Sequence, residues 1–428
     1  MKYAFIHANV FDGVNYEEIR KDLTVLVDGD KIEKVGFEGE IPRGYIVYDL
    51  NGKYLCPGLI NLHAHLFGTG KPSKMLGGGA MQKAVVNMTK TKIGHRVADM
   101  LAENSVTQAI NSGVTTLRSS GDFCYSDVRA RDNINKNKYI GPRLIVPGPA
   151  ITCIGGHGDG TFSQTSDSID ELVSFVDERK SNNVDYIKIC VTGGVMDAKV
   201  KGEPGVTKMT VEQTKAVCDR AHELGYMVAS HTESSKGIEV ALQGGVDTVE
   251  HGSFLDDNLV SLFKEKKSAF IVTTSPALPL AKLSPEITKL NELCIYNSEV
   301  VMNGMIEGAK RSLSEGIPVG LGTDASCPLV TPYNMWREID FFSRCYGVSN
   351  GFALHTATLV NAQIIGIDNI TGSVEDRKSA DLIVVKDNPL ESISALRDVD
   401  MVMVRGTLIR EPKVKKDEQI EQWLDSLQ

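Results

Sequence analysis

Short runs of β-branched and apolar residues alternate with helix-like segments through the middle of the chain. The eight runs are GLINLHAHL, GVTTLRSS, RLIVPGPAI, DYIKICVTGG, YMVASHTE, VDTVEHGS, AFIVTTS and IPVGLGTDA. The segments between them include VADMLAENSVTQAINSG, and several end in glycine, as helix C-termini prefer. Eight strand–helix units predict an α/β fold of the (β/α)8 barrel type. A doubly wound open sheet is the alternative for the same alternation.

The two ends of the chain show a different pattern. Residues 1–57 contain strand-like runs separated by Gly-Asp and Asn-Gly turns, and the last part returns to this style in SADLIVVKDN and MVMVRGTLIR. Neither end has enough strands for a domain of its own, so we expect the two to pair. The predicted division is residues 1–57 and 367–428 for a small β domain with a tail, and 58–366 for the barrel.

Composition restricts the class of partner. The chain has 428 residues, of which 42 % are hydrophobic, and its net charge of −9 argues against nucleic acid or an anionic membrane as main partner. We find no signal-peptide pattern at the start and no apolar run near the ~20 residues that span a bilayer. The eight cysteines are scattered, which favours a reducing compartment. We therefore expect a cytoplasmic protein with a small-molecule substrate.

Side chains suited to metal binding fall at the ends of the predicted strands, where barrels carry their chemistry. The first strand contributes His63 and His65, which project from one face because alternate residues in a strand point the same way. Later strands add Lys188, His231, His251 and Asp324. A single histidine of this kind is more often core packing, but the ordered set predicts a site for zinc or a similar divalent ion.

Lys188 is the informative member of this set. It lies in YIKICVTGG among apolar residues, so its ammonium must be paired, neutralised or modified. A desolvated lysine can react with carbon dioxide, and the resulting carbamate can bridge two metal ions. The alternative is an ion pair with Asp324 or Glu250.

These motifs resemble those of the amidohydrolase superfamily. The resemblance is carried by PGLINLHAHL, YIKICVTGG, SHTESSKGIEVALQGGVDTVEHGS, GLGTDAS and SADLIVVKDNPL, and it covers nearly the whole chain. The sequence is most similar to imidazolonepropionase-like and prolidase-like metal-dependent hydrolases, many of which release an amino acid from dipeptides or N-acyl amino acids. The resemblance implies a distorted (β/α)8 barrel with a small composite β-sandwich built from both chain ends. Relatives are commonly oligomeric, but no interface signature is visible here.

The resemblance also implies the ligand assignment. His63 and His65 would hold the more buried of two divalent ions, zinc in our prediction, and His231 and His251 would hold the other. N6-carboxylated Lys188 would bridge them.

The implied reaction is hydrolysis of a C–N amide bond in a dipeptide, an N-acyl amino acid or a cyclic amide. Zinc lowers the pKa of bound water to about 7, which makes hydroxide available near neutrality. Asp324 would bind the first ion and act as the catalytic acid/base, moving the proton to the leaving nitrogen. The sequence has no G-x-S-x-G motif to support a serine nucleophile.

Three further residues are predicted to contact the substrate. His157, in ITCIGGHGDG, resembles a catalytic histidine that holds or polarises the substrate carbonyl; otherwise it packs among loop glycines. Arg118 could bind a substrate carboxylate or form a structural ion pair. Glu233 stands where prolidase-like relatives often carry a tyrosine that contacts the substrate carboxylate. An acid there puts carboxypeptidase action in doubt and favours a cation, unless Glu233 orients a ligand histidine instead.

Other functions remain open at this point. Heterocycle deaminases on this scaffold usually hold one metal ion and use a strand-five glutamate, so Lys188 argues against this function and Glu233 for it. Lactone or phosphotriester hydrolysis would use the same two-metal site. A binding protein that has lost its chemistry would typically have lost ligands, and all six are present. Outside the site, Trp336 is predicted to be core packing, and residues 69–94 to form a mobile or solvated loop near the barrel mouth.

Overall fold

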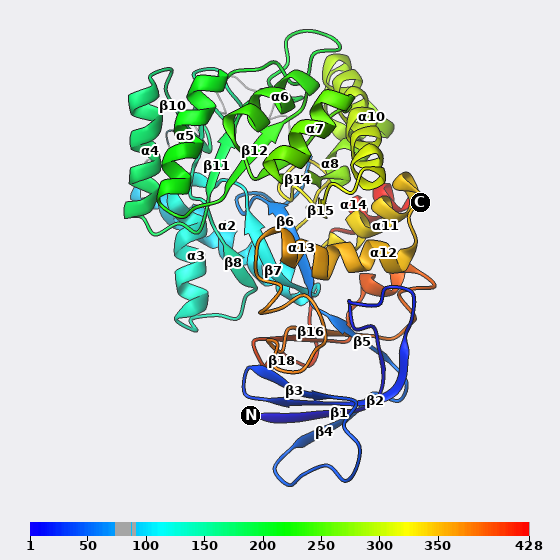
Figure 1. Ribbon diagram of the computed structural model, residues 1–428. Helices are drawn as coiled ribbons and strands as arrows, with labels where there is room; N and C mark the ends of the chain where they lie inside the picture. The colour runs from blue at the N-terminus through cyan, green and yellow to red at the C-terminus, as the bar shows by residue number, and fades with distance from the viewer. Residues whose placement is uncertain (73–86, 88–90, 428) are drawn as a thin grey trace.

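Strands from both chain ends form one mixed sheet at one end of the molecule (Figure 1). The computed structural model describes residues 1–72, 87 and 91–427, and this sheet has the order β18-β17-β16-β5-β1-β2-β3, with β4 paired to β1. The strands are β1 (Lys2–Val10), β2 (Arg20–Asp28), β3 (Lys31–Val35), β4 (Ile46–Asp49), β5 (Tyr54–Pro57), β16 (Leu382–Val385), β17 (Met401–Val404) and β18 (Thr407–Ile409). The ends meet where β5 and β16 pair antiparallel. The predicted pairing of the two chain ends is therefore confirmed.

The middle of the chain forms two parallel sheets. One has the order β6-β7-β8 and the other β10-β9-β11-β12-β13-β14-β15. Their strands are β6 (Leu59–Ala64), β7 (Val114–Ser119), β8 (Arg143–Ile145), β9 (Ala150–Thr152), β10 (Ser163–Thr165), β11 (Ile187–Cys190), β12 (Val228–Thr232), β13 (Thr248–His251), β14 (Ala269–Val272) and β15 (Val319–Leu321). A parallel bridge between Ala64 and Ala325 brings the end of β6 beside the turn that follows β15. The fold is thus mixed α/β with parallel sheets.

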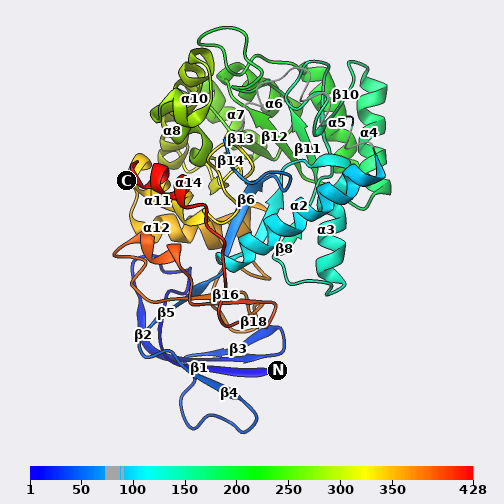
Figure 2. The same cartoon turned by 180° about the vertical axis from the view of Figure 1, so that it is seen from behind.

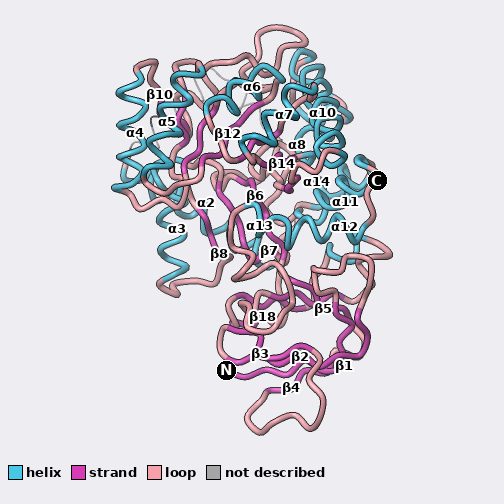
Figure 3. Tube along the Cα trace, viewed as in Figure 1, coloured by secondary structure: helices cyan, strands magenta, loops and turns pink. Residues whose placement is uncertain are grey.

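Helices cover the outer faces of the parallel strands (Figures 2 and 3). The helices of the described residues are α2 (Lys92–Asn111), α3 (Ser126–Asn135), α4 (Ile169–Ser181), α5 (Val211–Glu223), α6 (Ser235–Gly244), α7 (Asp257–Lys266), α8 (Thr274–Lys282), α9 (Pro285–Thr288), α10 (Glu292–Ser314), α11 (Met335–Tyr346), α12 (Asn350–His355), α13 (Asn361–Ile364) and α14 (Glu418–Asp425), with short η2 (Phe123–Tyr125), η3 (Thr356–Val360) and η4 (Ile393–Arg397). Because both faces of the strands are buried, their sequences read as continuous apolar runs. In the described part of the chain, no helix combines the length and apolarity that crossing a membrane requires.

The prediction of one strand at RLIVPGPAI is wrong, because this run forms two strands. The run RLIVPGPAI is divided into β8 and β9, which belong to different sheets. Its centre holds Pro147 and Pro149, which have no backbone N–H to donate, and Gly148 has a φ of +70°. The prolines therefore interrupt the ladder that the apolar pattern alone suggests.

Two smaller expectations have clear outcomes. Trp336, on α11, is only 2 % exposed, which confirms its assignment to the core. The predicted loop at 69–94 falls largely outside the described residues, and its last part is helical because α2 begins at Lys92 with Thr91 as its N-cap.

Candidate metal centre

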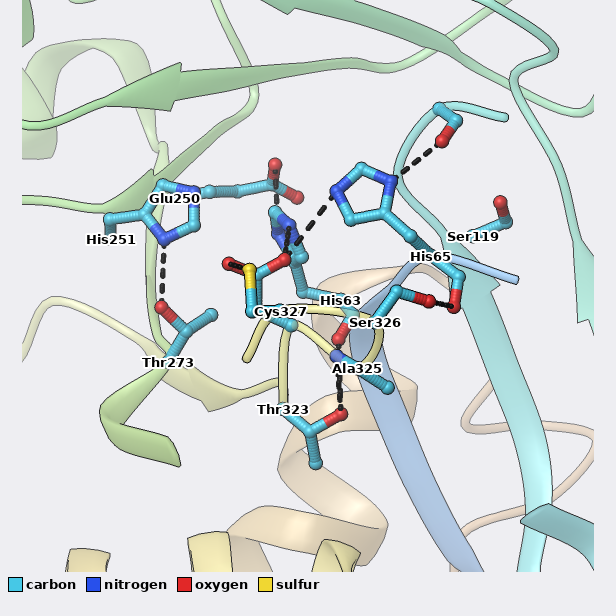
Figure 4. Close-up of polar contacts among 12 residues, drawn as sticks. His63, His65, Ser119, Glu250, His251, Thr273, Thr323, Ala325, Ser326 and Cys327 are labelled. Carbon is cyan, nitrogen blue, oxygen red and sulfur yellow. Dashed lines mark hydrogen bonds and ion pairs between the residues drawn. The ribbon is translucent and has the colours of Figure 1, made fainter. Parts of the chain in front are cut away.

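Three predicted ligands meet where β6 and β15 end. His63 lies in β6, His65 directly follows that strand, and Asp324 lies in the turn after β15. The Nε2 atoms of His63 and His65 are 3.3 and 3.4 Å from Oδ1 of Asp324. None of the three residues is more than 8 % exposed. We call them the first ligand group; Figure 4 shows its two histidines.

The backbone fixes the position of Asp324. The N–H groups of Thr323 and Asp324 donate to the carbonyl of His63 over 2.9 and 2.8 Å, and the N–H of His65 donates to Ala325 over 2.9 Å. Asp324 has a φ of +56°, a left-handed conformation that is unfavourable for a residue with a side chain and recurs at functional sites. The turn is thereby locked onto β6, with the carboxylate facing both imidazoles.

Hydrogen bonds set which nitrogen each imidazole presents. Nδ1 of His65 donates to the carbonyl of Gly121 over 2.6 Å, which leaves Nε2 as its lone-pair atom. Nδ1 of His251 is 2.7 Å from the hydroxyl of Thr273 (Figure 4). Such partners orient metal-binding histidines in proteins.

Two more predicted ligands meet at the ends of the neighbouring strands β12 and β13. His231 and His251 are each 3 % exposed, and their nitrogens lie within 4.8 Å of each other and of a carboxylate oxygen of Glu233. Nε2 of His231 donates a hydrogen bond to the carbonyl of Gly193 over 3.2 Å, so Nδ1 remains as the lone-pair atom. We call His231, Glu233 and His251 the second ligand group. The rings of His251 and His63 are 4.8 Å apart, so the two groups adjoin.

Lys188 lies beside these groups and is 2 % exposed. Its Nζ contacts the carboxylate of Glu250, which is also 3.1 Å from Nδ1 of His63 and accepts a 2.7 Å hydrogen bond from Arg118. The contact matches the ion pair that the sequence allowed. Burial, and secondarily the charge of Arg118, lowers the pKa of Lys188 to about 7. A neutral amine is therefore accessible near neutral pH, and this is the form that reacts with carbon dioxide.

The guanidinium of Arg118 forms hydrogen bonds with groups inside the protein. Besides Glu250, it donates from Nε to the carbonyl of Leu62 over 2.7 Å, and only 2 % of the residue is exposed. Of the two roles that the sequence allowed, this position corresponds to the structural ion pair.

His157 is held by a residue that the sequence analysis missed. Its Nδ1 is 2.5 Å from Oδ2 of Asp197, which also accepts from the backbone N–H of Gly194 over 3.0 Å. The His157 ring stacks on His231 with centroids 4.1 Å apart and planes 9° from parallel. The only sequence signal for Asp197 is an acid in the segment after the Lys188 strand, which no periodicity singles out.

The electrostatics of the first ligand group suit a cation. Burial lowers the pKa of His63 to about 4 and that of His65 to about 3, so both imidazoles are neutral, as ligands must be. Burial alone would raise the pKa of Asp324, but its attraction to His63, His65 and His251 whenever one of these imidazoles carries a proton holds that pKa well below its usual range. Asp324 is therefore ionised.

Three carboxylate oxygens at the site are buried and make no hydrogen bond among the described residues. They are Oδ1 of Asp324, Oε2 of Glu233 and Oε2 of Glu250, of which the last contacts Nζ of Lys188. Burial raises the pKa of Glu233 to about 8, with Asp197 and Asp324 adding to the effect. Unsatisfied buried oxygens are costly, whereas a divalent cation would satisfy them. Neutral imidazoles with carboxylates fit the ligand preferences of zinc and similar ions.

The chain is similar to known proteins over nearly its whole length. A family model for the amidohydrolase family matches residues 54–409. A solved structure from Bifidobacterium longum, described as a candidate prolidase, is 35 % identical, covers 99 % of this chain and 98 % of its own, and has a TM-score of 0.87. A Xaa-Pro dipeptidase structure with methionine bound in the active site is 28 % identical, covers 96 % of this chain and 100 % of its own, and has a TM-score of 0.83.

Another relative is less similar to this chain. Ochratoxinase of Aspergillus niger is 23 % identical over 446 aligned residues, which cover 96 % of this chain and 88 % of that protein. The family model alone spans well over half of the present chain. The chain belongs to the amidohydrolase family.

Proposed function

We propose that this protein hydrolyses a C–N amide bond in a small molecule, a dipeptide or an N-acyl amino acid, at a site for two divalent metal ions. The observation that carries the proposal is the pair of adjoining ligand groups at the carboxyl ends of parallel strands. The dipeptidase relative with methionine in its active site supports an amino acid as product. We further propose that the two parallel sheets form a distorted (β/α)8 barrel, and that the sheet of both chain ends is a composite β-sandwich divided at residues 57 and 367.

The residues present fit the expected ions. His63, His65 and Asp324 would hold one, His231 and His251 the other, with carboxylated Lys188 between them. Zinc ions in such a site would supply water of lowered pKa and polarise the scissile carbonyl.

The chain's own residues would move the proton and hold the substrate. Asp324 is ionised and its Oδ1 makes no hydrogen bond among the described residues, so it can accept the proton of the attacking water and pass it to the leaving nitrogen. Nδ1 of His157 donates to Asp197, and this carboxylate outweighs burial and raises the pKa of His157, so the protonated ring can also donate from Nε2 to the substrate carbonyl. Such a preorganised donor stabilises the developing oxyanion.

A substrate screen tests the proposal. Zinc-loaded protein is incubated with dipeptides, N-acyl amino acids and cyclic amides, and free amine and new carboxylate are measured. Asp324→Asn serves as the blank, and Asp159→Asn, in the loop after β9, serves as the matched control with an intact ligand set. Amine release that is lost only in Asp324→Asn supports the proposal. Ammonia from a heterocycle would instead indicate a deaminase, and turnover of lactones or phosphotriesters alone would indicate an esterase.

A further inference from the structure

We infer that Glu233 is a protein ligand of the second cation, so that His231, Glu233 and His251 form a complete three-residue site. The inference rests on the proposed metal-dependent function and assigns Glu233 to the ion rather than to the substrate.

Local geometry places Glu233 as it places the ligands of the first group. His63 and His65 are two positions apart at the end of β6, and His231 and Glu233 are two positions apart at the end of β12. Side chains at this spacing in extended chain share a face. A carboxylate oxygen of Glu233 accordingly lies within 4.8 Å of the ligand nitrogens of His231 and His251.

The backbone of Glu233 is fixed on both sides. Its N–H donates to the hydroxyl of Thr192 over 3.1 Å, and the hydroxyl of Ser234 donates to the carbonyl of Gly205 over 2.6 Å. Gly205 packs so closely that an added Cβ would lie 2.4 Å from the carbonyl carbon of Glu233. The side chain is therefore presented from a rigid segment, which suits a metal ligand.

The side chain of Glu233 is only partly satisfied by the protein. Oε2 is excluded from solvent and has no hydrogen-bond donor within the described part of the chain. A buried carboxylate oxygen in this condition is unfavourable unless a cation or a donor reaches it. Ring nitrogens of His231 and His251 lie within 4.8 Å of a carboxylate oxygen of Glu233, so the three side chains can bind the same ion.

The composition of the two groups supports the same reading. With Glu233 included, each group has two neutral imidazoles and one carboxylate. Two histidines with one glutamate are an established ligand set for catalytic zinc. Without Glu233 the second ion would have only neutral ligands apart from modified Lys188, whose Nζ lies against Glu250.

Metal stoichiometry tests the inference. Wild-type protein, Glu233→Gln and Glu233→Ala are stripped with chelator, reloaded with Zn²⁺ or Co²⁺ and freed of excess metal; bound ions per chain are then counted by mass spectrometry. Glu239→Gln, on α6, is the matched control because Glu239 pairs with Lys236 away from the site. We expect two ions in the wild type and control, and one ion in both Glu233 variants. Co²⁺ titration should show at least tenfold weaker affinity for the second ion.

Each result has a defined meaning. Glu233→Gln preserves shape, so circular dichroism and Tm separate ligand loss from misfolding. Two ions bound with wild-type affinity in Glu233→Gln, with only substrate preference altered, would overturn the inference and return Glu233 to the substrate. A wild type with fewer than two ions would overturn it as well. Two ions in the wild type without amide hydrolysis would refute the proposed function alone, and the stoichiometry of the variants would still decide the inference.

Discussion

At the scale of single residues, the candidate metal centre contains buried ionisable side chains. Burying such a group costs free energy unless a partner of opposite charge or a chemical modification compensates for the lost water. Lys188 illustrates this, because its amine is buried, has a lowered pKa of about 7, and lies against Glu250. Both an ion pair and a carbamate would relieve the desolvation of this amine. Only the carbamate would make Lys188 a ligand.

We expect Lys188→Ala to lose at least one metal ion and most of the amidase activity, because the bridging anion would be absent. Metal content and turnover are measured beside Lys215→Ala, which removes an exposed lysine of α5. Wild-type protein prepared with ¹³C-bicarbonate should show a carbamate carbon by NMR, and Lys188→Ala should not. Full turnover with both ions in the variant would leave Lys188 as an ion-pair residue only.

The partnership of Asp197 with His157 leads to a second prediction. Asp197→Asn keeps an acceptor for Nδ1 but removes the charge that holds the ring. Hydrogen bonds to charged groups contribute about 1.5–3 kcal/mol. We therefore expect kcat to fall about 10–100-fold with KM and metal content nearly unchanged. A parallel drop in bound metal would show instead that Asp197 acts by supporting His231, on which His157 stacks.

At the scale of elements, the strand pattern could be predicted and the loops could not. His63 and His65 are recognisable because a period of two places them on one face, and the strand-end rule for barrels does the same for His231, His251 and Asp324. The break between β8 and β9 was missed because apolar residues flank Pro147 and Pro149.

The supporting acids of the site escaped prediction for a different reason. Asp197 lies in a loop without period, and its partner His157 is 40 positions away along the chain. Glu250 adjoins His251 in sequence and was considered only as a partner of Lys188, although it also contacts His63 and Arg118. These contacts depend on how distant segments pack, which local patterns do not encode.

The loop after β11 provides a prediction at this scale. A Cβ on Gly194 would lie 3.0 Å from Nδ1 of His157 and 3.3 Å from Nε2 of His231. Gly194→Ala should therefore push both rings and reduce activity and second-ion affinity while the fold is retained. Gly193→Ala is the matched control, since its Cβ would meet atoms no closer than 3.6 Å. Equal behaviour of the two variants would show that the rings accommodate the added methyl.

At the scale of the whole molecule, the ligands join distant parts of the chain. The proposed ligands lie on or shortly after β6, β11, β12, β13 and β15, in two different sheets. An ion that binds only the folded chain stabilises it by mass action, by about 2.7 kcal/mol at a concentration 100-fold above Kd. Metal-free protein should accordingly have a lower Tm than loaded protein.

The stability of metal-free protein should also depend on pH. The folded chain keeps His63 neutral down to about pH 4 and His65 down to about pH 3, whereas their ordinary pKa is 6.5. Between pH 6.5 and 4 the unfolded chain thus binds more protons, so the free energy of unfolding decreases as the pH falls. The contribution that the neutral imidazoles of His63 and His65 make to the free energy of unfolding is complete above pH 6.5 and declines as the pH falls below that value.

We therefore expect the Tm of chelated protein to fall steadily between pH 7 and pH 5, measured by calorimetry. His65→Gln cannot take up this proton, so its Tm should fall less over the same range. His222→Gln, a surface histidine of α5 that pairs with Asp247, is the control and should follow the wild type. If His65→Gln instead retained the full wild-type slope, the pH dependence would arise elsewhere, and the buried imidazole of His65 would not be a group that acid must protonate to unfold the chain.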